Sequence, residues 1–391
     1  MGQWWTPEWR DELRRVVLDA PPDAAVAVVA RRVSESVGAA VEIRLSDRAG
    51  WDLHPVAASG AEPDQLETWS LDRGVAADAL WTRTVVREPG SGAVHVPITA
   101  RGTAYGVLTV CGPGSAGPGD RVDDDRPWAA LGQVVALVVG QAGQATDAWE
   151  VRRRASSYTV SAEMQWQQLP PTSLVADGVE LHALIEPAPR VSSDLFDWSI
   201  DRGRLWLAVL DADGRGLSAS LSASVALAAL RHARRSGLPL GEQISLVDQA
   251  VYDQFRGRAV VRAVVVEIEP GVGARMVAAG DPVAVPRVLR RRRGEVVELA
   301  ATENEDLGLF DRSQYVEQAV ELEDGDDLLV VTDGGPQAGQ DEQFGMAAVV
   351  QHFATMRAPA ALPRRLLDDL RRHVGGDLVQ DATALVVSLR R

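Results

Sequence analysis

The chain has 391 residues, of which 46% are hydrophobic and 24% are charged, a balance typical of a globular protein with a sizeable core. At about 150 residues per domain, this length predicts two or three domains. The net charge of -15 argues against nucleic acid or an anionic membrane as a partner. All 40 basic residues are arginine. This excludes P-loop nucleotide hydrolases, pyridoxal enzymes and protein kinases, because each needs a lysine.

Cys111 is the only cysteine, so we expect neither a disulfide framework nor a thiolate metal site. The first residues include tryptophans and acids where a signal peptide would have a basic segment and then an apolar one. The most apolar run, residues 128–142, is too short to span a bilayer. These features predict a protein of the reducing cytoplasm.

The first part of the chain predicts helices and paired strands. Two amphipathic patterns are separated by Pro21 and Pro22, and they indicate helices. Alternating apolar residues on either side of short turns indicate hairpins. The expected helices are 7–18 and 23–37, and the expected strands are 40–46, 51–57, 93–98 and 105–111.

A single long helix is expected from Trp128 to Leu169. Apolar residues recur along this stretch at roughly helical spacing, and Pro170 with Pro171 would end it. An apolar stripe on a helix that joins two domains can be a dimer interface. It can equally be the face by which the helix packs on its own domain. The sequence leaves both interpretations open.

From residue 178 onward the sequence is rich in predicted strands. The run 205–210 is apolar throughout and indicates a strand buried on both faces, whereas 315–322 alternates and indicates one wet face. Gly237 and Gly375 follow helical patterns at positions that favour a helix end. The expected strands are 179–185, 205–211, 259–269, 274–279, 283–289, 315–322, 327–332 and 383–389, and the expected helices are 217–236, 241–256 and 360–374.

Four aspartates are the candidate reactive residues. Asp211 and Asp333 end apolar strands and precede glycine-containing turns; Asp194 follows two serines, and Asp381 precedes the last strand. A carboxylate at such a position is costly to bury unless it is paired or binds a cation. Oxygen ligands without nearby His or Cys favour Mg²⁺ or Mn²⁺. Two such ions could hold a phosphoryl group and activate water to attack it.

Two glycine patterns suggest a nucleotide site as a less favoured alternative. Residues 112–117 match the dinucleotide pattern after a strand, but no helix is expected to follow. Residues 214–219 lie between a strand and a helix, but Asp211 and Asp213 would repel a pyrophosphate. Neither pattern therefore displaces the cation site.

A series of short motifs between residues 155 and 391 resembles the PPM-type serine/threonine phosphatases, specifically the bacterial stage II sporulation protein E type. Single motifs are weak, but their shared order is specific. The motifs are Gln165–Pro170, Pro187–Asp197, Asp211–Gly216, Ala278–Pro282, Leu307–Phe310, Asp324–Asp326, Thr332–Gly334, Phe344–Gly345 and Gln380–Thr383.

This resemblance implies two stacked antiparallel sheets flanked by helices, with a site for two Mn²⁺ or Mg²⁺ ions. Its implied catalytic and metal-binding residues are Asp194, Asp211 and Asp333, with the backbone carbonyl of Ala212. Gln380 occupies the position of a fourth metal aspartate, so one ion is expected to bind more weakly. Asp381 is a candidate replacement ligand.

Other positions also depart from the family pattern. Serines replace glycines before Asp194, and the residues before and after Asp211 differ as well. These departures favour a reduced catalytic activity. The substituted residues are Ser192, Ser193, Leu210, Arg215 and Asp281.

The N-terminal part is similar to a GAF domain, through residues 96–102, residues 105–110 and a closing helix. The predicted fold is therefore α+β: a GAF-like sensor domain at 10–145, a linking helix at 146–171 and a PPM-type α-β-β-α sandwich at 172–391.

The predicted function is a metal-dependent phosphatase acting on phosphoserine or phosphothreonine of a regulatory protein, such as an anti-sigma-factor antagonist. It would be controlled by the sensor domain and would dimerise through the linking helix. The alternative is a catalytically impaired pseudophosphatase that acts as a signalling binding module, favoured by Gln380 and the other departures.

Overall fold

The computed structural model describes most of the chain in two compact units, Met1–Ser157 and Tyr158–Arg391. Within the described ranges, no helix combines the length and the apolar content needed to cross a bilayer. The residues described are 4–111, 125–154, 159–176, 178–188, 193–269, 271–335, 337, 343–375 and 378–390.

The first unit is built on a six-stranded antiparallel sheet in the order β3-β2-β1-β6-β5-β4. The chain forms its central strands from the apolar alternations that predicted them. The strands are β1 (Ala40–Ser46), β2 (Asp52–Ala58), β3 (Trp69–Ser70), β4 (Val86–Arg87), β5 (Val94–Ala100) and β6 (Thr103–Cys111).

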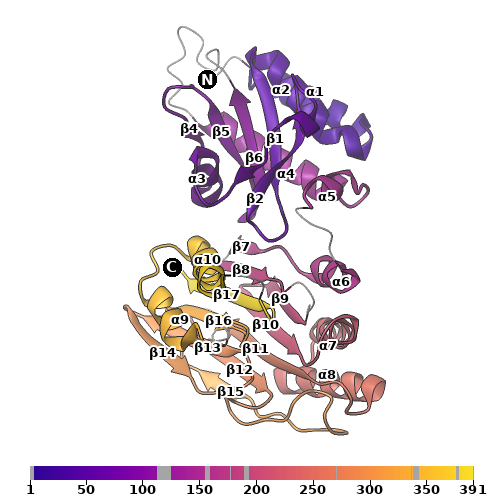
Figure 1. The fold of residues 1–391 in the computed structure, drawn as a ribbon, viewed down its shortest axis with the longest axis vertical. Helices are drawn as coiled ribbons and strands as arrows, with labels where there is room; N and C mark the ends of the chain where they lie inside the picture. Colours follow the sequence, from indigo (N-terminus) through magenta and orange to yellow (C-terminus); the bar gives the residue numbers. More distant parts are fainter. Residues whose placement is uncertain are drawn as a thin grey trace. The chain divides into compact units, whose positions relative to one another are not determined.

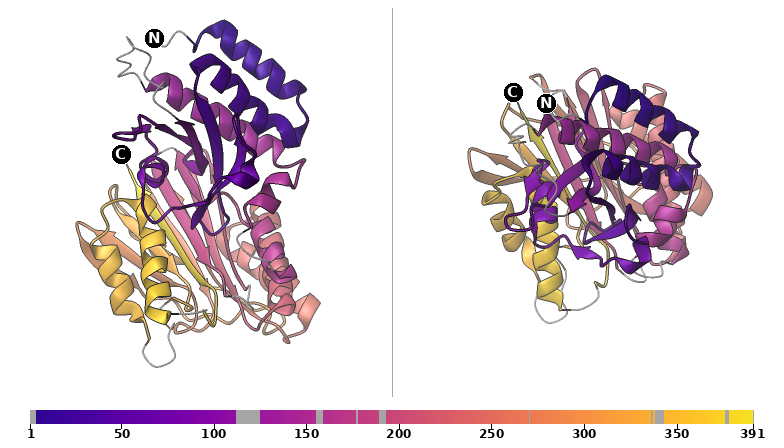
Figure 2. Two further views of the ribbon diagram at one scale, coloured as in Figure 1. Left: turned by 45° about the horizontal axis from the view of Figure 1, so that its top comes forward. Right: turned by 90° about the horizontal axis from the view of Figure 1, so that it is seen from above.

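Helices cover both faces of this sheet (Figures 1 and 2). One face packs against α1, α2, α4 and α5 through a core that includes Val29, Ile43 and Leu131. The other face packs against α3 around Leu53 and Leu80. The helices are α1 (Pro7–Asp19), η1 (Pro22–Ala24), α2 (Ala25–Val37), η2 (Pro63–Gln65), α3 (Val75–Thr82), α4 (Arg126–Ala142) and α5 (Ala148–Arg152).

The predicted continuous helix from 128 to 169 is wrong. Among the described residues, this stretch contains α4, α5 and α6 (Val160–Gln168) as separate helices. α4 stops at Gly143, whose backbone lies so close to Val139 and Trp149 that a Cβ there would sit 2.8 Å from the Val139 carbonyl oxygen. Thr159 then caps a new helix, its hydroxyl accepting from the Ala162 amide at 3.2 Å. Apolar residues do recur at helical spacing along this stretch, but the helix end at Gly143 and the cap at Thr159 divide it into separate helices.

The second unit contains two antiparallel sheets. The first has the order β15-β12-β11-β10-β9, and the second has the order β14-β13-β16-β17-β8-β7. The strands are β7 (Ser173–Ala176), β8 (Val179–Glu186), β9 (Asp194–Asp201), β10 (Arg204–Ala212), β11 (Val261–Glu269), β12 (Gly273–Ala279), β13 (Arg287–Arg292), β14 (Glu295–Leu299), β15 (Gln318–Val320), β16 (Asp327–Val331) and β17 (Ala382–Leu389).

These sheets form an α-β-β-α sandwich, as predicted (Figure 1). Side chains such as Phe196, Leu207 and Leu385 fill the space between the sheets. Helices α7 and α8 pack on the outer face of the five-stranded sheet, and α9 and α10 pack on the outer face of the other sheet. These helices are α7 (Leu217–Arg235), α8 (Leu240–Phe255), α9 (Gly345–Ala354), η3 (Pro359–Ala361) and α10 (Leu362–Val374).

Candidate active site

Two of the predicted aspartates face each other across neighbouring strands. Asp194 opens β9 and pairs directly with Asp211 near the end of β10. Every side chain from Leu205 to Ala212 is buried, so the strand carries its terminal carboxylate into the sandwich. Asp194 is 2% exposed and Asp211 is 7% exposed. The sheet register thus brings together two carboxylates that lie seventeen positions apart in the chain.

Asp194 is held by hydroxyl groups from the opposite sheet. Its Oδ2 accepts from Thr332 Oγ1 at 2.7 Å and from Thr383 Oγ1 at 2.6 Å. The Thr383 amide in turn donates to Thr332 Oγ1 at 2.9 Å. Burial, and then repulsion from Asp211, raises the pKa of Asp194 well above its usual range, and the two hydroxyls counteract only part of this rise.

Asp211 has a different environment. Arg262 pairs with it across β10 and β11, and its Nη1 lies 3.9 Å from Asp211 Oδ2. Burial, followed by repulsion from Asp333, raises the pKa of Asp211 to about 7, although Arg262 acts to lower it. The same guanidinium approaches Asp306 at 3.5 Å and the exposed Asp213 at 4.0 Å. Asp211 therefore lies in a group of acids with one arginine among them.

Asp333 follows β16 in a tight turn. It is partly buried, and burial is the main cause that raises its pKa. The next residue, Gly334, packs directly on the chain before β17, where an added Cβ would lie 1.8 Å from the Asp381 carbonyl oxygen. Any larger residue at 334 would push this turn away from Asp381, so the glycine fixes where Asp333 sits.

Asp381 differs from the other three because its carboxylate is fully hydrogen-bonded. Oδ1 accepts from the Ala188 amide at 2.8 Å. Oδ2 accepts from Gln165 Nε2 at 2.8 Å and from the Ser193 and Asp194 amides at 2.9 and 3.3 Å. Burial raises the pKa of Asp381, and these four donors oppose that rise. The carboxylate thus ties α6 and the start of β9 to the last strand.

The remaining predicted positions separate into buried and exposed groups. Ala212 is buried, and its amide donates to the Ser193 carbonyl at 3.2 Å. Gln380, Arg215 and Asp281 are exposed. Ser192 lies outside the described residues.

Sequence reasoning missed the roles of Arg262, Thr332, Thr383 and Gln165. Gln165, Thr332 and Thr383 lie inside the motifs that carry the family resemblance, so the sequence contained a signal for them. Arg262 lies in none of these motifs, and its place opposite Asp211 depends on strand register.

The carboxylates do not converge tightly. Within the described part of this unit, no three His, Cys, Asp or Glu side chains each place a ligand atom within 4.8 Å of the others. A cation held here would therefore take several of its ligands from water or backbone carbonyls, which is ordinary for Mg²⁺.

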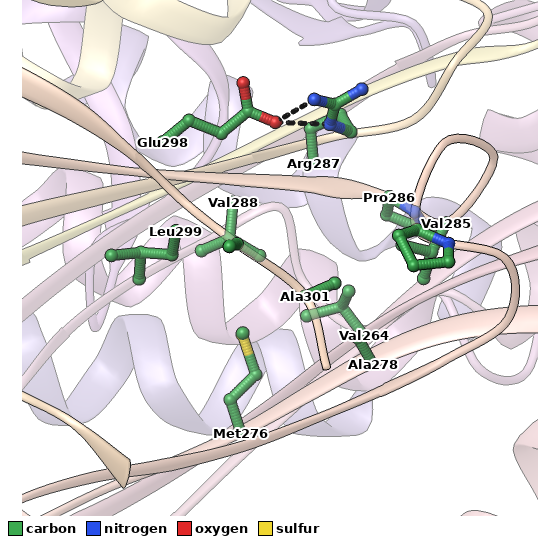
Figure 3. Close-up of a pocket in the computed structure, with 12 residues that line it drawn as sticks. Val264, Met276, Ala278, Val285, Pro286, Arg287, Val288, Glu298, Leu299 and Ala301 are labelled. Atoms are coloured by element: carbon green, nitrogen blue, oxygen red, sulfur yellow. Dashed lines mark hydrogen bonds and ion pairs between the residues drawn. The ribbon is translucent and has the colours of Figure 1, made fainter. Parts of the chain in front are cut away.

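A separate pocket lies between the edges of the two sheets (Figure 3). It has a volume of about 370 Å³. Val264, Met276 and Leu299 give it an apolar wall, and an Arg287–Glu298 ion pair lies beside them. None of the four aspartates lines this pocket, so the acidic site is not part of it.

A family model matches within the second unit. Residues 201–390 match the model of the stage II sporulation protein E (SpoIIE) family. The RsbU and RsbW domains of Rv1364c from Mycobacterium tuberculosis are 23% identical, with a TM-score of 0.49, covering 57% of this chain and 63% of that one.

Two further solved structures are similar. The PP2C phosphatase domain and a regulatory fragment of SpoIIE from Bacillus subtilis are 16% identical, with a TM-score of 0.46, covering 54% of this chain and 63% of that one. The SiaA-PP2C domain of Pseudomonas aeruginosa is 21% identical, with a TM-score of 0.44, covering 54% of this chain and 85% of that one. None of the curated proteins matches the chain.

Proposed function

Since residues 201–390 form a domain of the SpoIIE family of PPM-type phosphatases, we propose that the protein hydrolyses phosphoserine and phosphothreonine with the help of Mn²⁺ or Mg²⁺. The observation that carries this proposal is the buried Asp194–Asp211 pair. Two carboxylates that repel each other in a buried place, one with a pKa of about 7, are best relieved by a cation.

The donor set fits one hard cation better than two. Asp211 and Asp333 would hold this ion, because neither carboxylate is enclosed by the kind of donor set that surrounds Asp381. Asp194, paired with Asp211, would lie beside it. Asp381 we assign to positioning, since its oxygens accept four N–H groups. Gln380 offers only a neutral oxygen for a second ion.

When bound, the cation would supply the charge that polarises a phosphoryl group and lowers the pKa of water. Asp194 would keep its orientation through the hydroxyls of Thr332 and Thr383. Arg262, on the strand next to Asp211 and 3.9 Å from it, would favour the ionised form of that carboxylate. The two threonines would thus fix the orientation of Asp194, and Arg262 would influence the charge of Asp211, at the place where phosphate would bind.

The test is phosphate release from a phosphoserine peptide by the full chain. We expect release with Mn²⁺ or Mg²⁺ and none after the ions are removed by a chelator. An unphosphorylated peptide of the same sequence is the control for contaminating phosphate. Release that is unaffected by chelation would contradict the proposal.

A second candidate function is a pseudophosphatase, a binding module that retains the fold. Two observations favour it: Gln380 is exposed and neutral, and the Arg262 guanidinium approaches Asp211, Asp213 and Asp306, where it could replace a cation's charge. Calorimetric titration with Mn²⁺ separates the two functions. One or two bound ions with phosphate release favour the enzyme; bound ions without phosphate release, or no bound ion, favour the binding module.

The partner and the regulation are also part of the proposal. We infer a cytoplasmic signalling role in which the substrate is a phosphorylated regulatory protein, such as an anti-sigma-factor antagonist, and the GAF-like unit is the sensor. The identification of the substrate rests on family resemblance. Mixing the protein with a phosphorylated candidate and following loss of the phosphate by mass spectrometry would test it.

The proposed homodimer rests on a smaller surface than the sequence predicted. Trp149 and Trp166 of the apolar stripe are buried within their own units, and Ala155 lies outside the described residues. The outer side of α4 remains, where Leu137 is 66% exposed next to the partly exposed Val134 and Val138. We expect Leu137→Glu to convert a dimer to a monomer in light scattering, with Val272→Glu, another exposed valine or leucine position, as the control. A parent protein that is already a monomer at micromolar concentration would refute the dimer.

A further inference from the structure

A second group of potential metal ligands lies in the first unit, at the turn that joins β1 and β2. Asp47, Asp52 and His54 each place one ligand atom within 4.8 Å of the others. The strand pairing explains this arrangement. Asp52 and His54 are two residues apart on β2 and so share a face of the sheet, and the Asp47 amide donates to the Asp52 carbonyl at 2.9 Å.

His54 gives an independent indication that a ligand is missing from this group. Its side chain is 9% exposed, and its Nε2 is buried without a hydrogen-bond partner among the described residues. A buried ring nitrogen without a partner is unfavourable. A metal ion is one of the few ligands that can satisfy an imidazole and two carboxylates together.

The surrounding charges also favour a cation. Asp47 is 6% exposed, and its Oδ1 accepts from the Trp51 amide at 2.7 Å, an interaction that would orient the carboxylate. Two arginines of this region, Arg48 and Arg153, both pair with Glu150, at 3.0 and 2.5 Å, and Arg153 also interacts electrostatically with Asp47. Three acids and two arginines leave one negative charge in this region when His54 is neutral.

We propose that Asp47, Asp52 and His54 bind a divalent transition-metal ion, with Zn²⁺ as the best fit. One imidazole and two carboxylates are usual zinc ligands, and three protein ligands leave a position for water. Mg²⁺ and Ca²⁺ prefer all-oxygen sites. The site lies wholly within the first unit, so it is independent of the proposed phosphatase function.

The test uses the full chain with Asp211→Asn, which weakens the proposed cation site of the second unit. Zn²⁺ is titrated by calorimetry, and bound zinc is counted after dialysis. We expect one Zn²⁺ per chain. Asp52→Asn and His54→Gln should each weaken binding by at least about tenfold, because each removes a ligand. Asp78→Asn, an exposed acid on α3, should leave binding unchanged.

Thermal unfolding distinguishes lost ligands from lost folding. Zn²⁺ should raise the Tm of the chain with the intact site, since an ion that binds only the folded state stabilises it. At the same Zn²⁺ concentration it should raise the Tm of Asp52→Asn by less, and this substitution at a partly exposed position is expected to preserve the fold. Absence of bound zinc in the intact chain, or unchanged binding in both ligand variants, would overturn the proposal.

Discussion

An aspartate is buried near the end of β10 and another directly before β17, and the two carboxylates have opposite surroundings. Asp381 is 1% exposed, and four N–H donors occupy its oxygens. Asp211 is 7% exposed, and its nearest cation is the Arg262 guanidinium at 3.9 Å. Burial raises the pKa of both, but only Asp381 has a full set of donors that act against the rise.

This difference separates a structural carboxylate from one that is available for chemistry. Burial by itself does not distinguish them, because both are buried. What distinguishes them is whether the negative charge is already compensated by the protein. Asp381 is compensated and connects three segments of the fold, whereas Asp211 needs a further positive charge. The predictions below test this contrast.

Asp211→Asn should have the largest effect on activity. Loss of the carboxylate removes a proposed metal ligand, so phosphate release should fall by more than about 100-fold, since even residues behind a ligand typically contribute 10- to 100-fold. The fold should persist, because Asn is neutral, like the protonated aspartate. Phosphate release and thermal unfolding are the measurements, with Asp311→Asn, an exposed acid of the same unit, as the control. Activity within tenfold of the parent would refute this assignment.

Asp381→Asn should instead act on stability. The amide nitrogen of Asn cannot accept the hydrogen bonds that one carboxylate oxygen now receives, so buried donors would be left unpaired. We expect a loss on the order of 3 kcal/mol in the free energy of unfolding. Urea unfolding measures it, and Asp311→Asn should change the value by less than about 0.5 kcal/mol. An unaltered stability with lost metal binding would make Asp381 a ligand after all.

The sequence predicted most of the fold where periodicity was strong. The α+β class and the α-β-β-α sandwich are confirmed, and helices such as α7 and α10 lie close to their expected ranges. β9 was missed because its acids at 194, 197 and 201 conceal the apolar positions. The strand expected at 315–322 is shorter, at Gln318–Val320, since hydrogen bonds to side chains such as Asn304 hold the chain before it.

The candidate site was predictable in its residue types but not in its contacts. Motif order identified Asp194, Asp211 and Asp333, and strand ends explained why these carboxylates are buried. Which aspartate accepts hydrogen bonds from the protein depends on tertiary packing. The Gln165–Asp381 hydrogen bond, for example, joins residues 216 positions apart. A single sequence gives no register for such distant segments.

Gln380→Asp tests the contrast by adding a carboxylate directly before Asp381. Because Gln380 is exposed, the new carboxylate would stay in contact with solvent, where it could bind a hydrated ion. We expect tighter binding of a second Mn²⁺ and a gain in phosphate release of about tenfold, or about 1.4 kcal/mol. Gln351→Asp, an exposed position on α9, controls for the added charge. No gain in an inactive protein would favour the pseudophosphatase.

The last prediction concerns stability alone: a pH dependence in the metal-free protein. Because Asp211 has a pKa of about 7 in the folded chain, against 3.8 as the ordinary value, the folded state binds more protons than the unfolded state between these pH values. The free energy of unfolding should therefore fall as pH rises from about 4 to 7, by at most about 1.4 kcal/mol per pH unit from this group. Urea unfolding at pH 5, 6, 7 and 8 with a chelator would show it. In Asp211→Asn this contribution is absent, so the variant should gain stability relative to the parent as pH rises. Parallel curves for the two proteins would mean that the Asp211 charge is compensated within the fold, as the Asp381 charge is.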